Sequence, residues 1–360
     1  MPSIDELHSR LEAARAQEDS ATERELLIQL GDASSADARG EEAVAHYLAA
    51  LDLLDQEPSI ERMQVMDSLG KVYLFLRDRK KAIPLYEEVL DMARQFGDQR
   101  QVVVALGSIG NGLVMQGAHG EAIRHYREAL ELAQGIADLD GQANSLSNLG
   151  IALARIGQAE EAIPYFEQAL ALRQALDDKL GSSREIGFLA LAHLEAGRLD
   201  DALPLFADAL EVARQLGDRQ AELFRLTQLS SLQLKLGLLE EARSSTQASI
   251  ELAATLGAAS LGIEQSQQLA RILTDLGESK EALAICLDLL PQVEAADSRI
   301  DEGNLHWQIA RLHSQSGDLE AARAALEAAQ QAFQTCKAVH LVKRVEADLL
   351  GLTSDQPPLK

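Results

Sequence analysis

The sequence predicts an all-α solenoid made of eight helix hairpins that follow one another along the 360-residue chain. Three observations predict it: small residues that return about every forty residues, helical hydrophobic periodicity inside each repeat, and a core composition dominated by Ala and Leu. Aromatic residues make up only 4% of the chain, so aliphatic side chains must fill most of the core, which favours helices over sheets.

The repeat shows in three columns of residues that keep the same register. The first column is Ala43, Ala82, Ala122, Ala162, Ala202, Ala242, Ala282 and Ala322. The second is Gly31, Gly70, Gly110, Gly150, Ala190, Ser230, Ala270 and Ala310. The third is Ala38, Arg77, Gly117, Gly157, Gly197, Gly237, Gly277 and Gly317. Columns that stay in register over the whole chain predict eight structural repeats.

Each repeat is predicted to hold two helices, and the fourth repeat shows both. The first helix has one apolar face, formed by Leu146, Leu149, Gly150 and Leu153. Gly157 should end this helix. The second helix has a face formed by Ala162, Phe166, Ala169 and Leu170. The prolines that follow the alanine column should mark the starts of second helices, where a missing N–H costs little: Pro84, Pro164 and Pro204.

The junctions between repeats and the two ends of the chain complete the predicted elements. Gly97–Asp98 and Gly217–Asp218 should stop one helix and cap the next. The predicted organisation is an N-terminal capping helix in residues 1–19, eight repeats in 20–337, a C-terminal capping helix in 338–352 and a disordered tail in 353–360, since a solenoid needs caps on its end faces.

The small columns suggest close helix crossings, with Gly150 touching Ala162. Larger residues follow the alanine column and should fill the space between neighbouring repeats: Tyr47, Tyr86, Tyr126, Phe166, Phe206, Thr246, Cys286 and Leu326. Cys286 is therefore interpreted as a small apolar core residue and not as a reactive thiol, because no basic residue or histidine is placed to activate it.

These residues resemble the tetratricopeptide repeat family over about residues 20–352. The resemblance is carried by Leu149, Gly150, Gly157, Ala162, Phe166, Ala169 and Leu170 with their equivalents in the other repeats. The period of 40 is longer than the usual repeat of about 34. It is similar to the longer-helix subtype of Pins and kinesin-light-chain adaptors. The resemblance implies a right-handed superhelix whose first helices line a concave groove, suited to a peptide or a partner helix.

Two groups of residues are candidates for binding in that groove. In the third to fifth repeats, the residues are Asn111, Asn144, Asn148, Ile151, Arg184 and Leu191. Asn can follow a peptide backbone and Arg can hold a carboxylate, as in family members that grip a terminal carboxylate. Gly107 and Phe188 stand where that grip needs basic residues, so an internal peptide segment fits better. The alternative is that these are ordinary solvated residues.

The second candidate group lies in the seventh and eighth repeats: Arg271, Trp307 and Arg311. Trp and Arg are frequent interface anchors. The alternative is a tryptophan packed under the C-terminal helix with Arg311 stacked on its ring.

Charge and the missing motifs narrow the function further. The net charge of −24 disfavours nucleic acid, either keeps the chain soluble or favours a basic partner, and predicts a monomer at low salt. The N-terminus lacks the pattern of a signal peptide and no segment is long and apolar enough for membrane insertion, which predicts a cytoplasmic protein. The two cysteines and the scattered histidines show no disulfide, metal or catalytic spacing, and no nucleotide or hydrolase motif occurs.

The sequence therefore predicts a non-enzymatic adaptor, without cofactor or metal, that binds a protein or peptide partner, either basic or carrying an apolar anchor. The alternative is a regulator whose superhelix changes pitch when a ligand or signalling peptide binds.

Overall fold

A computed structural model describes residues 3–353, and within that range the chain forms eighteen α-helices and no strand. The chain divides into two compact units, residues 1–198 and 199–360. None of the described helices combines the length and the hydropathy that crossing a membrane would require.

The helices of the first unit (unit 1) are α1 (Ile4–Ala16), α2 (Ser20–Ala36), α3 (Gly40–Asp52), α4 (Ile60–Phe75), α5 (Arg79–Phe96), α6 (Gln99–Met115), α7 (His119–Gly135), α8 (Leu139–Arg155), α9 (Ala159–Ala175) and α10 (Lys179–Glu195). Those of the second unit (unit 2) are α11 (Leu199–Leu216), α12 (Arg219–Lys235), α13 (Leu239–Thr255), α14 (Ala259–Asp275), α15 (Ser279–Ala295), α16 (Arg299–Gln315), α17 (Leu319–Thr335) and α18 (Val339–Thr353).

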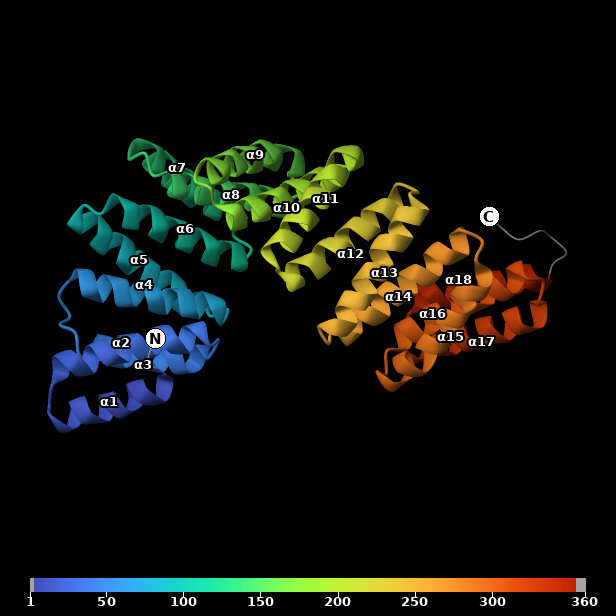
Figure 1. Ribbon diagram of the computed structural model, residues 1–360, viewed down its shortest axis with the longest axis horizontal. Coiled ribbons are helices and arrows are strands. Elements are labelled where there is room, and N and C mark those ends of the chain that lie inside the picture. The colour runs from blue at the N-terminus through green and yellow to red at the C-terminus, as the bar shows by residue number, and fades with distance from the viewer. Residues whose placement is uncertain (1–2, 354–360) are drawn as a thin grey trace. The chain divides into compact units, whose positions relative to one another are not determined.

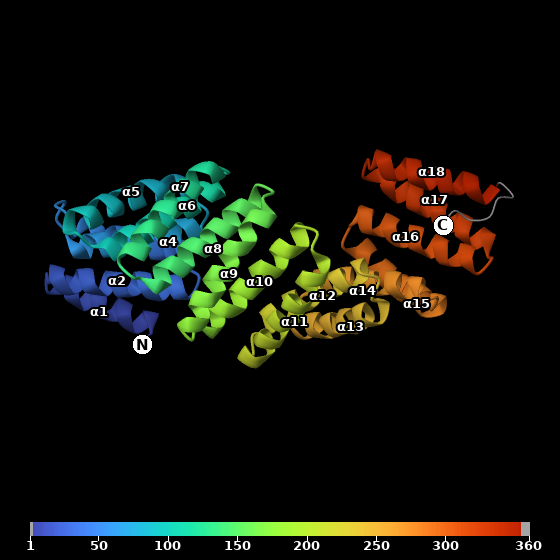
Figure 2. The same ribbon diagram turned by 90° about the horizontal axis from the view of Figure 1, so that it is seen from above.

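Within each unit, consecutive helices are joined by short turns and pack on one another as hairpins (Figure 1, Figure 2). The helices α1 and α18 lie outside the hairpins that the repeat pattern predicts. Of the predicted tail 353–360, Thr353 is the last residue of α18, and residues 354–360 lie outside the described part of the chain.

The predicted stop and start residues form the turns. Gly157 follows α8 with φ of +81°, the left-handed conformation that glycine adopts without a steric penalty. Asp98 caps α6 by accepting a hydrogen bond from the Gln101 N–H at 3.0 Å. At seven other turns a non-glycine residue takes the positive φ, and two of these residues, Ala38 and Arg77, belong to the third column, so glycine is favoured in that column but not required.

The prolines differ from the prediction, because they lie in the second turn of their helices and do not mark the first. Helix α5 begins at Arg79, five residues before Pro84, and α9 begins at Ala159, five residues before Pro164. Both prolines are exposed. Water can therefore hydrogen-bond the carbonyl group that lacks an N–H partner, which lowers the cost of proline inside a helix.

The glycine column of unit 1 exists because an aromatic ring of the same hairpin lies on it. A Cβ atom built on Gly31 would stand 2.6 Å from Cε1 of Tyr47, and one built on Gly150 would stand 2.7 Å from Cε1 of Phe166. The ring of Phe166 also stacks on Phe188 of the next repeat, with centroids 5.6 Å apart. The bulky column thus packs within its own hairpin and against its neighbour.

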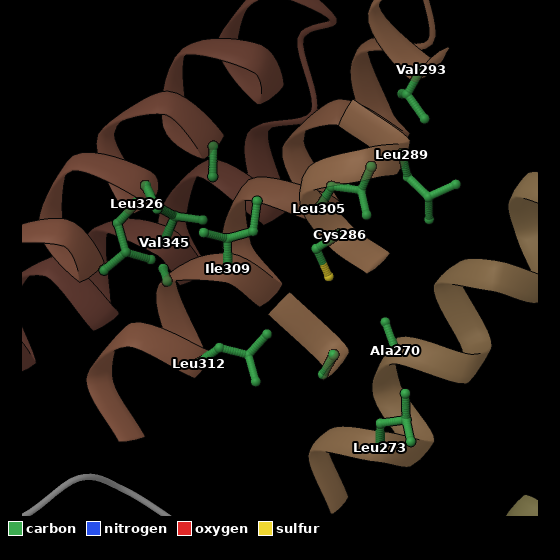
Figure 3. Packing of buried hydrophobic residues seen from close by; sticks show 14 of the residues in the cluster. Ala270, Leu273, Cys286, Leu289, Val293, Leu305, Ile309, Leu312, Leu326 and Val345 are labelled. Carbon is green, nitrogen blue, oxygen red and sulfur yellow. The ribbon is translucent and has the colours of Figure 1, made fainter. Parts of the chain in front are cut away.

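After Phe206, the core of unit 2 uses smaller side chains at the same positions, namely Thr246, Cys286 and Leu326. Cys286 of α15 is fully buried among Leu289 of its own helix, Ala270 of α14 and Ile309 of α16 (Figure 3). Burial raises the pKa of the Cys286 thiol to about 11, an effect that the nearby positive charge of Arg271 only partly offsets. A thiol protonated at neutral pH and closed off from water is a packing residue, as the sequence predicts.

Candidate functional site

Six of the predicted binding residues lie on three first helices of unit 1, α6, α8 and α10, and each of these helices packs on the next. We call their shared surface the first-helix face; it comprises Asn111, Asn144, Asn148, Ile151, Arg184 and Leu191. Three of these residues are exposed: Asn111, Asn144 and Arg184. The other three, Asn148, Ile151 and Leu191, are half-buried. All six therefore keep some surface available to a partner.

Asn111 already has one partner inside the protein. Its Oδ1 accepts a hydrogen bond of 2.7 Å from the hydroxyl of Tyr126, and the Tyr47 hydroxyl donates in the same way to Asp32, at 2.6 Å. In the fourth repeat the ring is Phe166, which has no hydroxyl, and the corresponding position holds the apolar Ile151. A nearly buried tyrosine needs an acceptor, which accounts for Asp32 and Asn111 at this position. In the second repeat the position holds Lys71, and the Tyr86 hydroxyl donates to the carbonyl oxygen of Asp67 at 3.5 Å instead. The Nδ2 donors of Asn111 and one lone pair of its Oδ1 remain for a ligand.

Asn144 is held in place from below by a buried arginine. Arg173 of α9 is 4% exposed; its Nη2 donates to Oδ1 of Asn144 at 2.5 Å and its Nη1 donates to Oδ1 of Asp140. The Nδ2 of Asn144 donates in turn to Oδ2 of Asp140, at 3.2 Å. Asp178 adds a second carboxylate to Arg173 at 3.2 Å. Asn144 is therefore chiefly part of a charged network between α8 and α9, a role that its place on the helix surface does not reveal.

Asn148 and Arg184 differ from these two residues, because nothing in residues 3–353 forms a hydrogen bond or ion pair with either side chain. Close by in the third repeat, Gly107 has no atom within 4 Å of the place where a Cβ would stand. The face thus carries one amide group and one guanidinium group with unused hydrogen-bonding capacity, next to open space on α6.

A buried carboxyl group lies behind the exposed guanidinium. Glu185 is 0% exposed, and neither of its oxygens has a hydrogen bond of good geometry in the described structure. Burial raises the pKa of this carboxyl group, while the nearby Ser147, Arg184 and Arg173 oppose the rise. The sequence Arg184–Glu185 gives the impression of a solvated polar pair; the helical position of Glu185, which matches the buried Ala105 and Ser145 of earlier repeats, was the available signal that it points inward.

The second predicted group lies in unit 2 and is not one cluster of free side chains. Nε1 of Trp307 donates to Oδ2 of Asp348 on α18 at 2.7 Å, and the cation over its ring, 4.9 Å from the centroid, is Arg344 of α18. This corrects the expectation that Arg311 stacks there, since Arg311 pairs with Asp275 at 3.4 Å. The half-buried Trp307 thus helps to dock the C-terminal helix, and Arg271 is exposed on α14.

Comparison with known proteins agrees with this geometry. Models of the tetratricopeptide repeat match residues 22–95, 101–175, 186–220 and 304–336. None of the curated proteins matches the chain.

Among solved structures, the chain is similar to a signal transduction ATPase with a tetratricopeptide repeat sensor from Pyrococcus horikoshii, at 11% identity and a TM-score of 0.70, over 95% of this chain and 55% of that one. It is also similar to aspartyl phosphate phosphatase F from Bacillus subtilis, at 14% identity and a TM-score of 0.55, over 92% and 94% of the two chains. A third is a Rap protein complexed with competence and sporulation factor, at 20% identity and a TM-score of 0.54, over 77% and 82%. Likeness at these identities establishes the fold. With the repeat models covering more than half of the sequence, the chain belongs to the tetratricopeptide repeat family.

Proposed function

We propose that this protein is an interaction scaffold that binds a peptide segment of a partner protein on the first-helix face of unit 1. One observation carries the proposal: Asn148 and Arg184 offer unused hydrogen-bonding groups on the same helix faces as the half-buried Ile151 and Leu191, which follow them by three and seven residues. An amide that both donates and accepts can pair with a peptide backbone, and a guanidinium group can hold a carboxylate with two hydrogen bonds. The apolar pair supplies a place for an aliphatic or aromatic anchor of the peptide.

Two of the six residues of the first-helix face already have hydrogen-bond partners inside the protein. The amide of Asn144 is engaged by Arg173 and Asp140, and the oxygen of Asn111 is engaged by Tyr126. A backbone amide or carbonyl of the peptide would therefore meet Asn148 first, with the Nδ2 group of Asn111 as a second donor. An acidic residue in the peptide is the natural partner of Arg184.

The test uses peptides selected from a displayed library on the wild-type protein and then measured one by one by isothermal titration. The variant with Asn148→Ala and Arg184→Ala should bind them roughly tenfold or more weakly, because a hydrogen bond to a charged group is worth about 1.5–3 kcal/mol. The control carries Arg127→Ala and Gln134→Ala, polar and charged residues at exposed positions of α7, and should bind as the wild type does. Equal affinity of both variants, with circular dichroism unchanged, would reject the first-helix face as the site.

A second candidate is a regulator that changes conformation when it binds a signalling peptide. It is favoured by the fold likeness to a Rap protein whose structure was determined in complex with competence and sporulation factor. A selected peptide that reduces the radius of gyration in solution scattering would support this function, and a peptide that binds without changing the scattering profile would support the static scaffold.

A further inference from the structure

Three potential metal ligands converge in unit 2, between the seventh and eighth repeats. Glu294 lies in the last turn of α15, and Glu302 and His306 lie four residues apart on α16. One ligand atom from each of the three residues lies within 4.8 Å of the other two, and no other such group occurs within the described residues 3–353. We propose that Glu294, Glu302 and His306 bind a divalent transition-metal ion of the Zn²⁺ type.

The negative charges of Glu294 and Glu302 are only partly balanced by positive charges nearby. The last turn of a helix carries partial negative charge, and a carboxylate placed there is unfavourable. Helix α15 nevertheless places Glu294 in that turn, with no basic residue beside it. Glu302 brings a second carboxylate close to the first. A single cation pairs with the cluster from outside: Nη1 of Arg299 contacts Oε2 of Glu302 at 2.7 Å. No ion pair in the described structure reaches the Glu294 carboxylate, so a bound cation would offset both repulsive terms.

The donor set selects the class of ion. Ca²⁺ and Mg²⁺ take oxygen ligands, whereas imidazole favours Zn²⁺ and the neighbouring first-row ions. The half-buried His306 supplies such an imidazole nitrogen from α16, four residues after Glu302 on the same helix. Three protein ligands would leave one position of a tetrahedral ion for water or for a partner's side chain.

The geometry requires only a small rearrangement. Ligand atoms about 2.1 Å from a tetrahedral ion stand roughly 3.4 Å apart. The atoms of the three residues are within 4.8 Å of one another, so rotations of the two glutamate side chains can close the site without moving the helices. Arg299 holds one oxygen of Glu302 and draws its negative charge away from the metal position, which predicts that Arg299 competes with the ion. A bound ion would join the end of α15 to α16.

Trp307, the sole tryptophan of the chain, is next to His306 and provides a local readout. The experiment titrates untagged, chelator-treated protein with Zn²⁺ by calorimetry and with Cu²⁺ by tryptophan fluorescence, since Cu²⁺ quenches nearby indole rings. We expect one ion per chain, with matching quenching. Glu294→Gln and His306→Gln should each weaken binding at least tenfold. The controls are Glu264→Gln, an exposed glutamate of α14, and His313→Gln, the other histidine of α16; both should bind within twofold of the wild type.

A fifth variant should move the affinity in the opposite direction. Arg299→Gln releases Glu302 from its ion pair, so we expect it to bind Zn²⁺ several-fold more tightly than the wild type. Glu294→Gln should also raise the thermal midpoint of the metal-free protein while it abolishes the rise caused by Zn²⁺. A purely structural role of the cluster would change folding without this reversal. Equal Zn²⁺ binding by the wild type, Glu294→Gln and His306→Gln would overturn the proposal, as would the absence of binding at submillimolar Zn²⁺.

Discussion

Glu185 is the residue whose environment departs furthest from what its side chain prefers. The carboxyl group is enclosed between α8, α9 and α10, and its pKa is raised chiefly by this burial. For a carboxyl group whose pKa is higher when folded, the folded state binds the proton more tightly than the unfolded state does. The stability of unit 1 should therefore fall as the pH rises from the unfolded value of 4.5 through the raised folded value.

Replacing this carboxyl group by an amide should remove that loss. Glu185→Gln should raise the free energy of unfolding by about 1–3 kcal/mol at pH 8, because a buried charge without good hydrogen bonds is costly, and should change it little at pH 4. Urea unfolding followed by circular dichroism at both pH values measures this. Glu167→Gln, an exposed glutamate of α9, is the control. A less stable Glu185→Gln at pH 8 would show that Arg173 and Arg184 stabilise the charged form.

Individual residues also show where prediction from the sequence ends. The packing roles of Gly150 and Phe166 can be predicted from the sequence, because residues of similar type recur at the same positions in the neighbouring repeats. The contact of Arg173 with Asn144 links residues 29 positions apart and depends on the rotamers of two long side chains, which no periodicity reports. The same limit applies to the metal cluster, where the spacing of Glu302 and His306 is visible in the sequence and the approach of Glu294 from another helix is not.

At the scale of the elements, the two helices of a hairpin in unit 1 pack closely where a glycine of the first helix contacts an aromatic ring of the second. A Cβ atom at position 150 would stand 2.7 Å from the ring of Phe166. Gly150→Ala should therefore destabilise unit 1 by about 1–3 kcal/mol, as overpacking does. Gly107→Ala is the matched control: it adds the same methyl group to a neighbouring first helix where nothing lies within 4 Å, so it should stabilise by up to about 1 kcal/mol through helix propensity.

The chain itself suggests the compensating change. In the eighth repeat the small column holds Ala310 and the bulky column holds Leu326. The double variant with Gly150→Ala and Phe166→Leu should therefore recover part of the stability that Gly150→Ala loses, and a double-mutant cycle in urea measures the coupling. If the two effects simply add, the ring is not what excludes the methyl group.

At the scale of the whole molecule, the division into two units falls within the fifth repeat, between α10 and α11. The three columns run through this repeat in register, so the sequence predicts a continuous array and gives no sign of a boundary. One detail distinguishes the fifth repeat: it combines Ala190 with the aromatic Phe206, whereas the first four repeats combine glycine with an aromatic residue. The fifth repeat therefore lacks the contact between a glycine and an aromatic ring that the first four repeats have.

Two units of this kind should unfold as separable steps. Tyr126→Ala removes a buried ring from unit 1 and should cost that unit about 3–5 kcal/mol. Trp307 reports on unit 2 alone, whereas circular dichroism reports on all helices. In urea, Tyr126→Ala should lower the midpoint of part of the dichroism transition and leave the midpoint of the fluorescence transition unchanged. A common shift of both signals would mean that the chain unfolds as one cooperative unit.

Packing between consecutive hairpins has a consequence for how such a chain changes over generations. Each hairpin occupies one period and is held mainly by the hairpins before and after it. A tandem duplication or a deletion of forty codons therefore adds or removes one whole hairpin and leaves the inward and outward faces of all the others in phase. A change of one or two codons inside a helix would instead rotate the following side chains of that helix away from their faces. Inheritance can thus lengthen or shorten this protein in whole repeats while the copies drift apart in sequence, as the second column has done by changing from glycine in the first four repeats to alanine or serine in the last four.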